Sequence, residues 1–211
     1  GGQLTPQYNH TYVFENDFAA LPKEGPNFEL NEGLLQAKSE QGRCWVVCFS
    51  PDHSKTLADL STTELERVLK TWQQAYHELA NLDNINYVQI FENKGAIMGC
   101  SNPHPHGQIW AQESLPNEVL KRDLQQADYY QKHQRSLLSD YLQQELAARE
   151  RIILEEERFV VLVPFWAIWP YEAMIIPKRP QQSILDILPE EEKSFVKALQ
   201  QLTRAYDKVF N

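Results

Sequence analysis

The sequence predicts an α+β fold, in which short strands and long helices occupy separate stretches of the chain. Short apolar runs bounded by turn residues indicate strands, and apolar stripes with helical spacing follow Ser61 and Pro189. The order of strand, loop and helix in the first part recurs about 130 residues later. With 211 residues, of which 42% are hydrophobic and 23% charged, the chain can bury a substantial core.

Strands are expected at residues 12–14, 34–38, 43–49, 87–92, 159–164 and 173–177. The third of these is apolar on both faces, which predicts a central strand. Cys44 and Cys48 share one of its faces and are interpreted as core thiols, with metal ligands as the alternative. Together with Cys100 they form no Cys-x-x-Cys pair, which predicts free thiols in a reducing compartment.

Three helical stretches are expected. Ser61-Thr62-Thr63-Glu64 forms a capping box, and the helix after it has an apolar stripe made of Leu65, Val68, Leu69, Trp72, Tyr76 and Leu79. A polar helical region runs from Asn117 to about Arg149. The last helix follows Pro189, with its stripe at Phe195, Leu199, Leu202, Tyr206 and Val209.

The last helix and the loop before it resemble an earlier part of the same chain. Phe195 and Tyr206 lie about 130 residues after Leu65 and Tyr76, and the loop at 180–183 follows the loop at 51–54 by nearly the same distance. Any two amphipathic helices can be aligned in this way, so chance remains the alternative to a duplication. If the fold is duplicated, the second copy is expected to be incomplete, because the chain stops before a counterpart of His104.

The stretch from Asn93 to Trp110 concentrates small and chemically reactive side chains. His104, His106 and Gln108 alternate along it, so on an extended strand all three would leave the same face. Because proline lacks an N–H, the prolines at 103 and 105 predict an edge strand or a sharp entry into a strand. The alternative is a loop whose two histidines only hydrogen-bond to the core.

This motif resembles the galactose-1-phosphate uridylyltransferase family, a branch of the histidine-triad superfamily. The resemblance rests on residues 91–95 and 99–110, and matching stretches at 12–20, 48–57 and 166–172 extend it along nearly the whole chain. It implies a histidine-triad-like antiparallel sheet with packed helices, duplicated, with a catalytic half at 1–115. A connecting helix and a partial second half would then occupy 116–211.

The resemblance implies a ping-pong transfer of UMP between UDP-glucose and galactose 1-phosphate, in galactose metabolism. His106 corresponds to the nucleophile that carries UMP covalently. His53 and His104 correspond to two of the four ligands of a zinc ion, and the family's zinc-binding Cys-x-x-Cys precedes the segment present here. Positions expected to contact the substrate are Asn16, Asp17, Asn93, Gly99, Cys100 and Ser101. For Asn16, Asp17 and Asn93 a turn-forming role is an equal alternative.

Gln108 separates the candidate activities. Histidine-triad hydrolases generally carry a third histidine at this position, and glutamine cannot act as an acid or base, although its amide can hydrogen-bond a phosphoryl oxygen. Transfer is therefore favoured over hydrolysis or phosphorolysis of dinucleoside polyphosphates. A second family metal site is doubtful, because Arg122 replaces its glutamate and only the neighbouring Asp123 could substitute.

The net charge of −9 argues against a nucleic-acid partner, and no apolar run reaches membrane length. The expected partners are UDP-glucose or UDP-galactose and hexose 1-phosphates, and the resemblance implies a cytoplasmic homodimer. A non-catalytic nucleotide-binding module is the rival interpretation. The chain alone is expected to show little transfer to galactose 1-phosphate, since the family's hexose-binding segment would lie after Asn211.

Overall fold

The computed structural model describes residues 6–100, 102 and 104–210. The chain forms two compact units. The first comprises Gly1–Thr56 and Lys70–Leu115, and the second comprises Leu57–Leu69 and Pro116–Asn211. The boundary therefore crosses helix α1 (Thr62–Ala80), whose two ends belong to different units. No helix among the described residues is long and apolar enough to cross a membrane.

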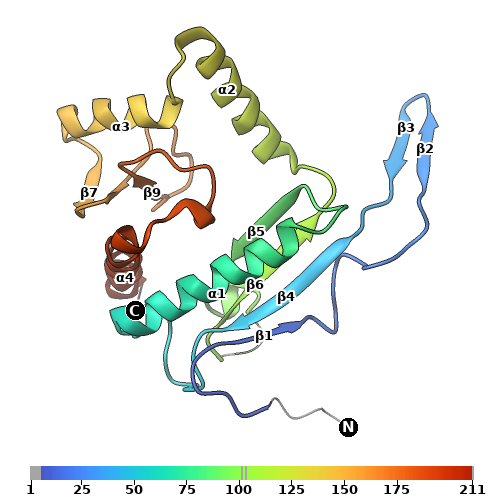
Figure 1. Ribbon diagram of the computed structural model, residues 1–211, viewed down its shortest axis with the longest axis horizontal. Helices are drawn as coiled ribbons and strands as arrows, with labels where there is room; N and C mark the ends of the chain where they lie inside the picture. The colour runs from blue at the N-terminus through green and yellow to red at the C-terminus, as the bar shows by residue number, and fades with distance from the viewer. Residues whose placement is uncertain (1–5, 101, 103, 211) are drawn as a thin grey trace. The chain divides into compact units, whose positions relative to one another are not determined.

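The first unit is built on a four-stranded antiparallel sheet with the order β1-β4-β6-β5 (Figure 1). Its strands are β1 (Tyr12–Glu15), β4 (Gly42–Cys48), β5 (Tyr87–Phe91) and β6 (His106–Gln112). The bounds of β1, β4 and β5 confirm strands expected from the sequence, and β6 decides for a strand over the loop alternative at His106 and Gln108. The antiparallel pairing agrees with the α+β prediction. The two central strands, β4 and β6, pair from Gly42↔Gln112 to Cys48↔His106.

Strand β6 has one buried face and one partly exposed face. Gly107, Ile109 and Ala111 are buried and alternate with His106 and Gln108, which are partly exposed. The ring of Phe49 borders Gly107 and meets Trp72 of α1 edge-on at 6.0 Å, so the buried face is the one that α1 covers. Since side chains alternate across a strand, His106 and Gln108 leave the opposite face.

Helix α1 begins as the capping box predicts. The backbone N–H of Ser61 donates to Glu64 Oε2 at 2.8 Å, and the N–H of Glu64 donates to Ser61 Oγ at 3.2 Å. These reciprocal bonds satisfy two of the N–H groups that a helix start leaves unpaired. Leu65, Val68, Leu69 and Leu79 of the predicted stripe are buried.

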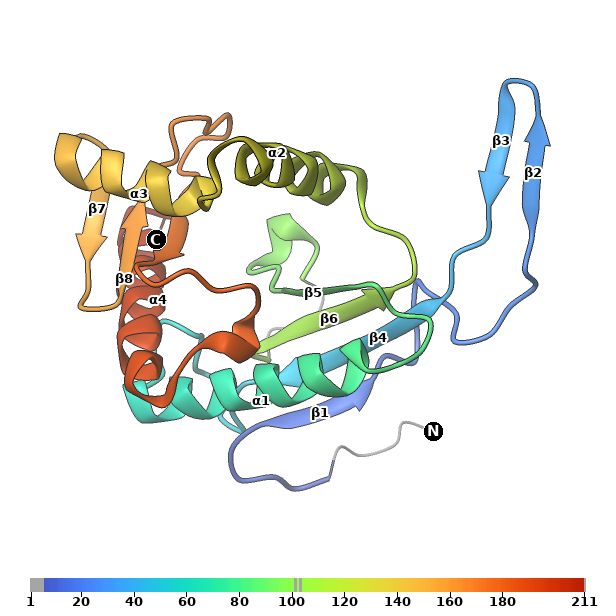
Figure 2. The same cartoon turned by 45° about the horizontal axis from the view of Figure 1, so that its top comes forward.

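A hairpin of β2 (Glu29–Glu32) and β3 (Leu35–Lys38) extends from the first unit (Figure 2). The sequence predicts only its second strand. One face carries Leu30 opposite Ala37, and the other carries Glu29 opposite Lys38. Because nearly all of its side chains are exposed, the hydrophobic pattern that marks core strands is weak here.

The second unit contains a three-stranded antiparallel sheet with the order β7-β8-β9. Its strands are β7 (Ile152–Glu155), β8 (Phe159–Leu162) and β9 (Met174–Pro177), of which β7 is not expected from the sequence. A core of Val160, Leu162, Ile176 and Leu142 lies between this sheet and helix α3 (Leu137–Ala148). All four residues of β8 are buried.

The polar helical region expected as one stretch is two helices, α2 (Asn117–His133) and α3. Gln134 adopts a left-handed conformation with φ 55°, which ends α2. Ser136 then caps α3 by accepting a hydrogen bond from the N–H of Ser139. The expectation of a single helical region was therefore wrong at these residues, where a left-handed residue and a serine cap stop and restart the helix.

Helix α4 (Pro189–Phe210) confirms the last predicted helix but not its stripe. Val209 is exposed, whereas Val196, Ala198 and Gln200 are buried. Gln200 donates from Nε2 to the carbonyl of Leu60 at 2.6 Å, so the chain before α1 covers a face that the periodicity assigns to solvent. The buried residues of α4 differ from the predicted stripe because the helix packs against β8 on one side, where Phe195 meets Phe159, and against the segment around Leu60 on another.

Candidate active site

His106 stands at the first position of β6, where the sheet gives way to the loop before it. Its partner across the ladder is Cys48 at the end of β4, and the backbone N–H of Phe49 donates to the carbonyl of Pro105 at 3.0 Å. Of the two predicted alternatives, an edge strand or a sharp turn into a strand, the structure has the second, because Pro105 comes directly before the central strand β6. His104 therefore lies outside the strand, and only His106 and Gln108 share a strand face as expected.

The ring of His106 has a fixed orientation. Its Nδ1 lies 2.7 Å from the carbonyl oxygen of His104. A carbonyl oxygen can only accept, so Nδ1 carries the proton and Nε2 keeps its lone pair when the ring is neutral. An unprotonated imidazole nitrogen held in this way can act as a nucleophile.

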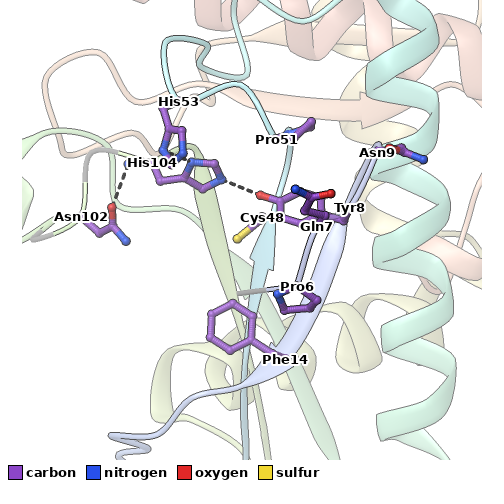
Figure 3. A pocket seen from close by; sticks show the side chains of 10 residues that line it. All are labelled: Pro6, Gln7, Tyr8, Asn9, Phe14, Cys48, Pro51, His53, Asn102 and His104. Atoms are coloured by element: carbon purple, nitrogen blue, oxygen red, sulfur yellow. Dashed lines mark hydrogen bonds between the residues drawn. The ribbon is translucent and has the colours of Figure 1, made fainter. Parts of the chain in front are cut away.

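The ring of His104 is held at both nitrogens (Figure 3). Its Nδ1 lies 2.8 Å from Nδ1 of His53, and its Nε2 lies 2.8 Å from the hydroxyl of Tyr8. Its backbone N–H donates to Asn102 Oδ1 at 3.0 Å. Burial lowers the pKa of His104, and the neighbouring His53 and His106 lower it further, which favours the neutral ring.

Tyr8 is a site residue that the sequence did not single out. Its hydroxyl donates to the carbonyl of Ser50 at 3.1 Å as well as contacting His104. Burial raises the pKa of Tyr8, and the neighbouring Cys48 thiol adds to this shift. The contact with His104 joins residues 96 positions apart in the sequence, and no local pattern marks it.

Two pockets of the first unit meet at His104. One, of about 450 Å³, is bordered by His106, His104 and the loop that carries Asn93, Lys94 and Cys100. The other, of about 540 Å³, is bordered by Tyr8, Phe14, Cys48, His53 and His104 (Figure 3). The nucleophile candidate faces the first pocket, and the paired imidazoles face the second.

The predicted substrate-binding residues are only partly brought together. Asn93 and Cys100 line the pocket that His106 borders, and Gly99 has φ 82°, a conformation that favours glycine. Asn16 accepts from the N–H of Phe18 at 3.0 Å, as a turn-forming residue would, and Asp17 next to it is exposed. Neither borders the described pockets, and Ser101 lies outside the described residues.

Gln108 lies two residues along β6 from His106, on the same face. Its Oε1 accepts from Trp110 Nε1 at 3.3 Å, which leaves its NH₂ group available to a ligand. In the second unit, Arg122 and Asp123 are exposed on α2, and Arg122 borders an apolar pocket with Trp166.

The imidazoles of His53 and His104 fit one half of a zinc site. Their Nδ1 atoms face one another, and nitrogen donors suit zinc, which takes four ligands in structural sites. Among the residues that the structure describes, no three His, Cys, Asp or Glu side chains gather closely enough to hold a metal. The described residues therefore supply two zinc donors and no third.

Comparison with known proteins gives the chain its family. The sequence model of the N-terminal domain of galactose-1-phosphate uridyl transferase matches residues 1–116, and that of the C-terminal domain matches 122–211. The chain is 48% identical to galactose-1-phosphate uridylyltransferase of Haemophilus influenzae, over 99% of this chain and 60% of that protein. The chain belongs to the galactose-1-phosphate uridyl transferase family.

Other family members and solved structures agree. The galactose-1-phosphate uridylyltransferase of Saccharomyces cerevisiae is 39% identical, over 99% of this chain and 61% of that protein. A solved uridylyltransferase superposes with a TM-score of 0.84 at 26% identity, covering 93% of this chain and 62% of that one. An ADP-glucose phosphorylase from Arabidopsis thaliana, solved with bound ADP-glucose, gives 0.76 at 26% identity, covering 91% of this chain and 58% of that one. The chain thus spans about 60% of the length of these galactose-1-phosphate uridyl transferase relatives.

Proposed function

We propose that this chain carries the centre for UMP transfer between UDP-glucose and galactose 1-phosphate, with His106 as the covalent carrier. The observation that supports this most directly is the hydrogen bond between His106 Nδ1 and the carbonyl of His104. It leaves Nε2 as the nucleophilic atom, on a ring that borders a pocket of about 450 Å³. Family membership supplies the substrates, which the relatives' names give as galactose 1-phosphate and a uridylyl group.

In the first half-reaction, the lone pair of His106 Nε2 attacks the α-phosphorus of UDP-glucose. A phosphorus–nitrogen bond forms, the bond from the α-phosphorus to the bridging oxygen breaks, and glucose 1-phosphate leaves with the electron pair. The imidazole becomes positively charged, and the carbonyl of His104 stabilises it by accepting the Nδ1 proton's hydrogen bond. A phosphate oxygen of galactose 1-phosphate then attacks the same phosphorus, the phosphorus–nitrogen bond breaks, and UDP-galactose is released.

Other residues act on the phosphates. The NH₂ group of Gln108 would donate a hydrogen bond to a phosphoryl oxygen of the intermediate. Because an amide cannot act as an acid or base, it would not assist attack by water. Contacts of Asn93, Gly99, Cys100 and Ser101 with the phosphates belong to the proposal on the family resemblance. The N–H groups of Gly99 and Cys100 donate to the carbonyls of Ala96 and Gly95 in the structure, so a phosphate would have to replace these bonds. For Asn16 and Asp17, contact with the uridylyl group remains a proposal that only the family resemblance supports.

We also propose that His53 and His104 hold a zinc ion, which would link the end of β4 to the loop before β6. The two facing Nδ1 atoms support this proposal. Three cysteines without a disulfide support a reducing compartment such as the cytoplasm. A homodimer belongs to the same proposal, on the family resemblance alone.

The test is the half-reaction. Incubation with UDP-glucose alone, followed by mass spectrometry of the quenched protein, should show one added UMP that maps to His106. His106→Gln should abolish the adduct, whereas the control His77→Gln, on α1, should keep it. An adduct on His104 would refute the assignment.

Two further reagents separate the alternatives. Galactose 1-phosphate should remove the adduct faster than water does, although slowly in this chain alone, because Gln108 gives no acid or base to hydrolysis. Faster loss to water would favour a hydrolase. An adenylyl adduct from ADP-glucose in preference to the uridylyl adduct would favour the activity named for the Arabidopsis neighbour.

A further inference from the structure

The phenol of Tyr8 joins three segments of the first unit: the chain before β1, the end of β4 and the loop before β6. Its hydroxyl lies 3.1 Å from the carbonyl of Ser50. It also lies 2.8 Å from Nε2 of His104 (Figure 3). Its ring stacks on Tyr12 with 5.4 Å between centroids, which fixes the direction in which the hydroxyl points. Tyr8 is therefore placed by packing as well as by hydrogen bonds.

The Ser50 carbonyl, which can only accept, favours one arrangement of the protons in this network. A phenol has a single proton, and Tyr8 donates it to the carbonyl of Ser50, which can only accept. The phenol oxygen is then the acceptor for Nε2–H of His104. With its proton on Nε2, His104 presents the lone pair of Nδ1 toward Nδ1 of His53, as a zinc ion held by these two nitrogens would also require.

The same residue, His104, controls the nucleophile through its backbone. Its carbonyl accepts from His106 Nδ1 at 2.7 Å. Because His104 lies before the first residue of β6, the sheet ladder does not hold this carbonyl. Pro105 restricts the backbone of the residue before it to extended conformations, and the His104 N–H bond to Asn102 Oδ1 and the side-chain contacts of His104 add to this restraint.

We propose that Tyr8 is a positioning residue for the reaction of His106. By holding the ring of His104, it keeps the His104 carbonyl on Nδ1 of His106 and so keeps Nε2 unprotonated and aimed into its pocket. Tyr8 borders the larger pocket and His106 borders the smaller one, so Tyr8 acts through His104 and touches no reacting atom. The inference rests on the proposed function of His106.

The chain offers a matched pair of variants. Tyr8→Phe removes the hydroxyl and keeps the stacked ring. Tyr12→Phe removes a hydroxyl from the neighbouring ring of the same stack, for which the described part of the chain provides no hydrogen-bond partner. The two variants lose the same atom, and only the first loses the contact with His104.

The first readout is the tautomer of His106, measured by ¹H–¹⁵N correlation of the imidazole nitrogens in the labelled protein without substrate. The native protein and Tyr12→Phe should show the Nδ1–H form, and Tyr8→Phe should show an increased share of the Nε2–H form. This measurement does not depend on the reaction. An unchanged tautomer in Tyr8→Phe would overturn the proposal.

The second readout is the rate of UMP adduct formation against UDP-glucose concentration. Tyr8→Phe should lower the limiting rate about tenfold or more, the usual effect of losing a partner that orients a functional histidine, with the half-saturating concentration unchanged. A rise in that concentration with the limiting rate preserved would make Tyr8 a binding residue and overturn the proposal. If the native protein forms no adduct, the proposed function fails, while the tautomer comparison still decides whether Tyr8 orients His106.

A second variant separates orientation from folding. 3-Fluorotyrosine at position 8 keeps the ring and the hydroxyl that accepts from His104, and it should keep both the tautomer and most of the rate. If it loses the rate as far as Tyr8→Phe does while both remain folded by their amide spectra, the hydrogen bond is not the cause and the proposal is wrong.

Discussion

Gly107 lies between His106 and Gln108 on β6, and it has no room for a side chain. A Cβ added there would lie 2.8 Å from Cζ of Phe49 and 2.9 Å from the backbone oxygen of Phe91. Carbon atoms in contact normally stand about 3.5–4.0 Å apart, so one or both neighbours must move by more than half an ångström. The Phe49 ring is buried, and moving Phe91 would strain its pairing with Gln108.

Gly107→Ala should therefore destabilise the protein by about 2–3 kcal/mol, the upper part of the range for overpacking a core. In a chain of this size that corresponds to a fall in melting temperature of roughly 4–12 °C. Thermal unfolding followed by circular dichroism would measure it. The rate of adduct formation should fall as well, because His106 and Gln108 flank the displaced residue.

Gly33→Ala is the control for substituting a glycine without crowding. Gly33 has φ 63° in the tip of the β2–β3 hairpin and no heavy atom within 4 Å of an added Cβ. It should cost only the backbone strain, about 1–2 kcal/mol, and leave adduct formation unchanged. A melting temperature for Gly107→Ala within a degree of the native value would refute the argument from close contact.

Two further predictions concern charge and metal. Arg179 makes two hydrogen bonds to buried Glu191, at 2.8 and 2.7 Å, and holds the pKa of that carboxyl at about 2. The ion pair stabilises the folded protein fully above the usual glutamate pKa of about 4.3, and this stabilisation is lost as the pH falls toward 2. The urea concentration at the unfolding midpoint should fall between pH 5 and pH 3 in the native protein. Glu191→Gln should reduce this fall, and Glu190→Gln should leave it unchanged. With His53 and His104 as its donors, the chain should lose zinc on dialysis against a mild chelator, and stoichiometric retention would show that further residues complete the site.

Local signals account for the parts of the fold that the sequence predicts correctly. The capping box at Ser61 and Glu64 and the apolar runs of β1, β4 and β5 need no distant partner to be recognised. The break between α2 and α3 depends on a left-handed Gln134, which the sequence does not mark as a glycine would. The buried positions of α4 depend on the segment around Leu60, about 140 residues away, which no helical period can encode.

The candidate site divides in the same way. The spacing of His104, His106 and Gln108 is a local signal, and the two histidines do lie in direct contact. Their arrangement differs from the expected row on one strand, because Pro105 puts His104 before the strand and turns its carbonyl toward His106. Tyr8 could not be predicted, since its role depends on how the chain before β1 returns to the end of β4.

The position of His106 at the start of β6 also has a consequence for how the protein opens. Its amide neighbours belong to the central ladder with β4, a region whose hydrogen bonds are expected to exchange with solvent only through extensive unfolding. The segment from Asn93 to Cys100 has only the short 3₁₀ turn Ala96–Met98 and few buried side chains, so it can open at a much lower free energy. The groups proposed to face the phosphates can then rearrange while the proposed nucleophile, His106, stays in register. We therefore expect the loop to open for a nucleotide many times before the central strands that hold His106 open once.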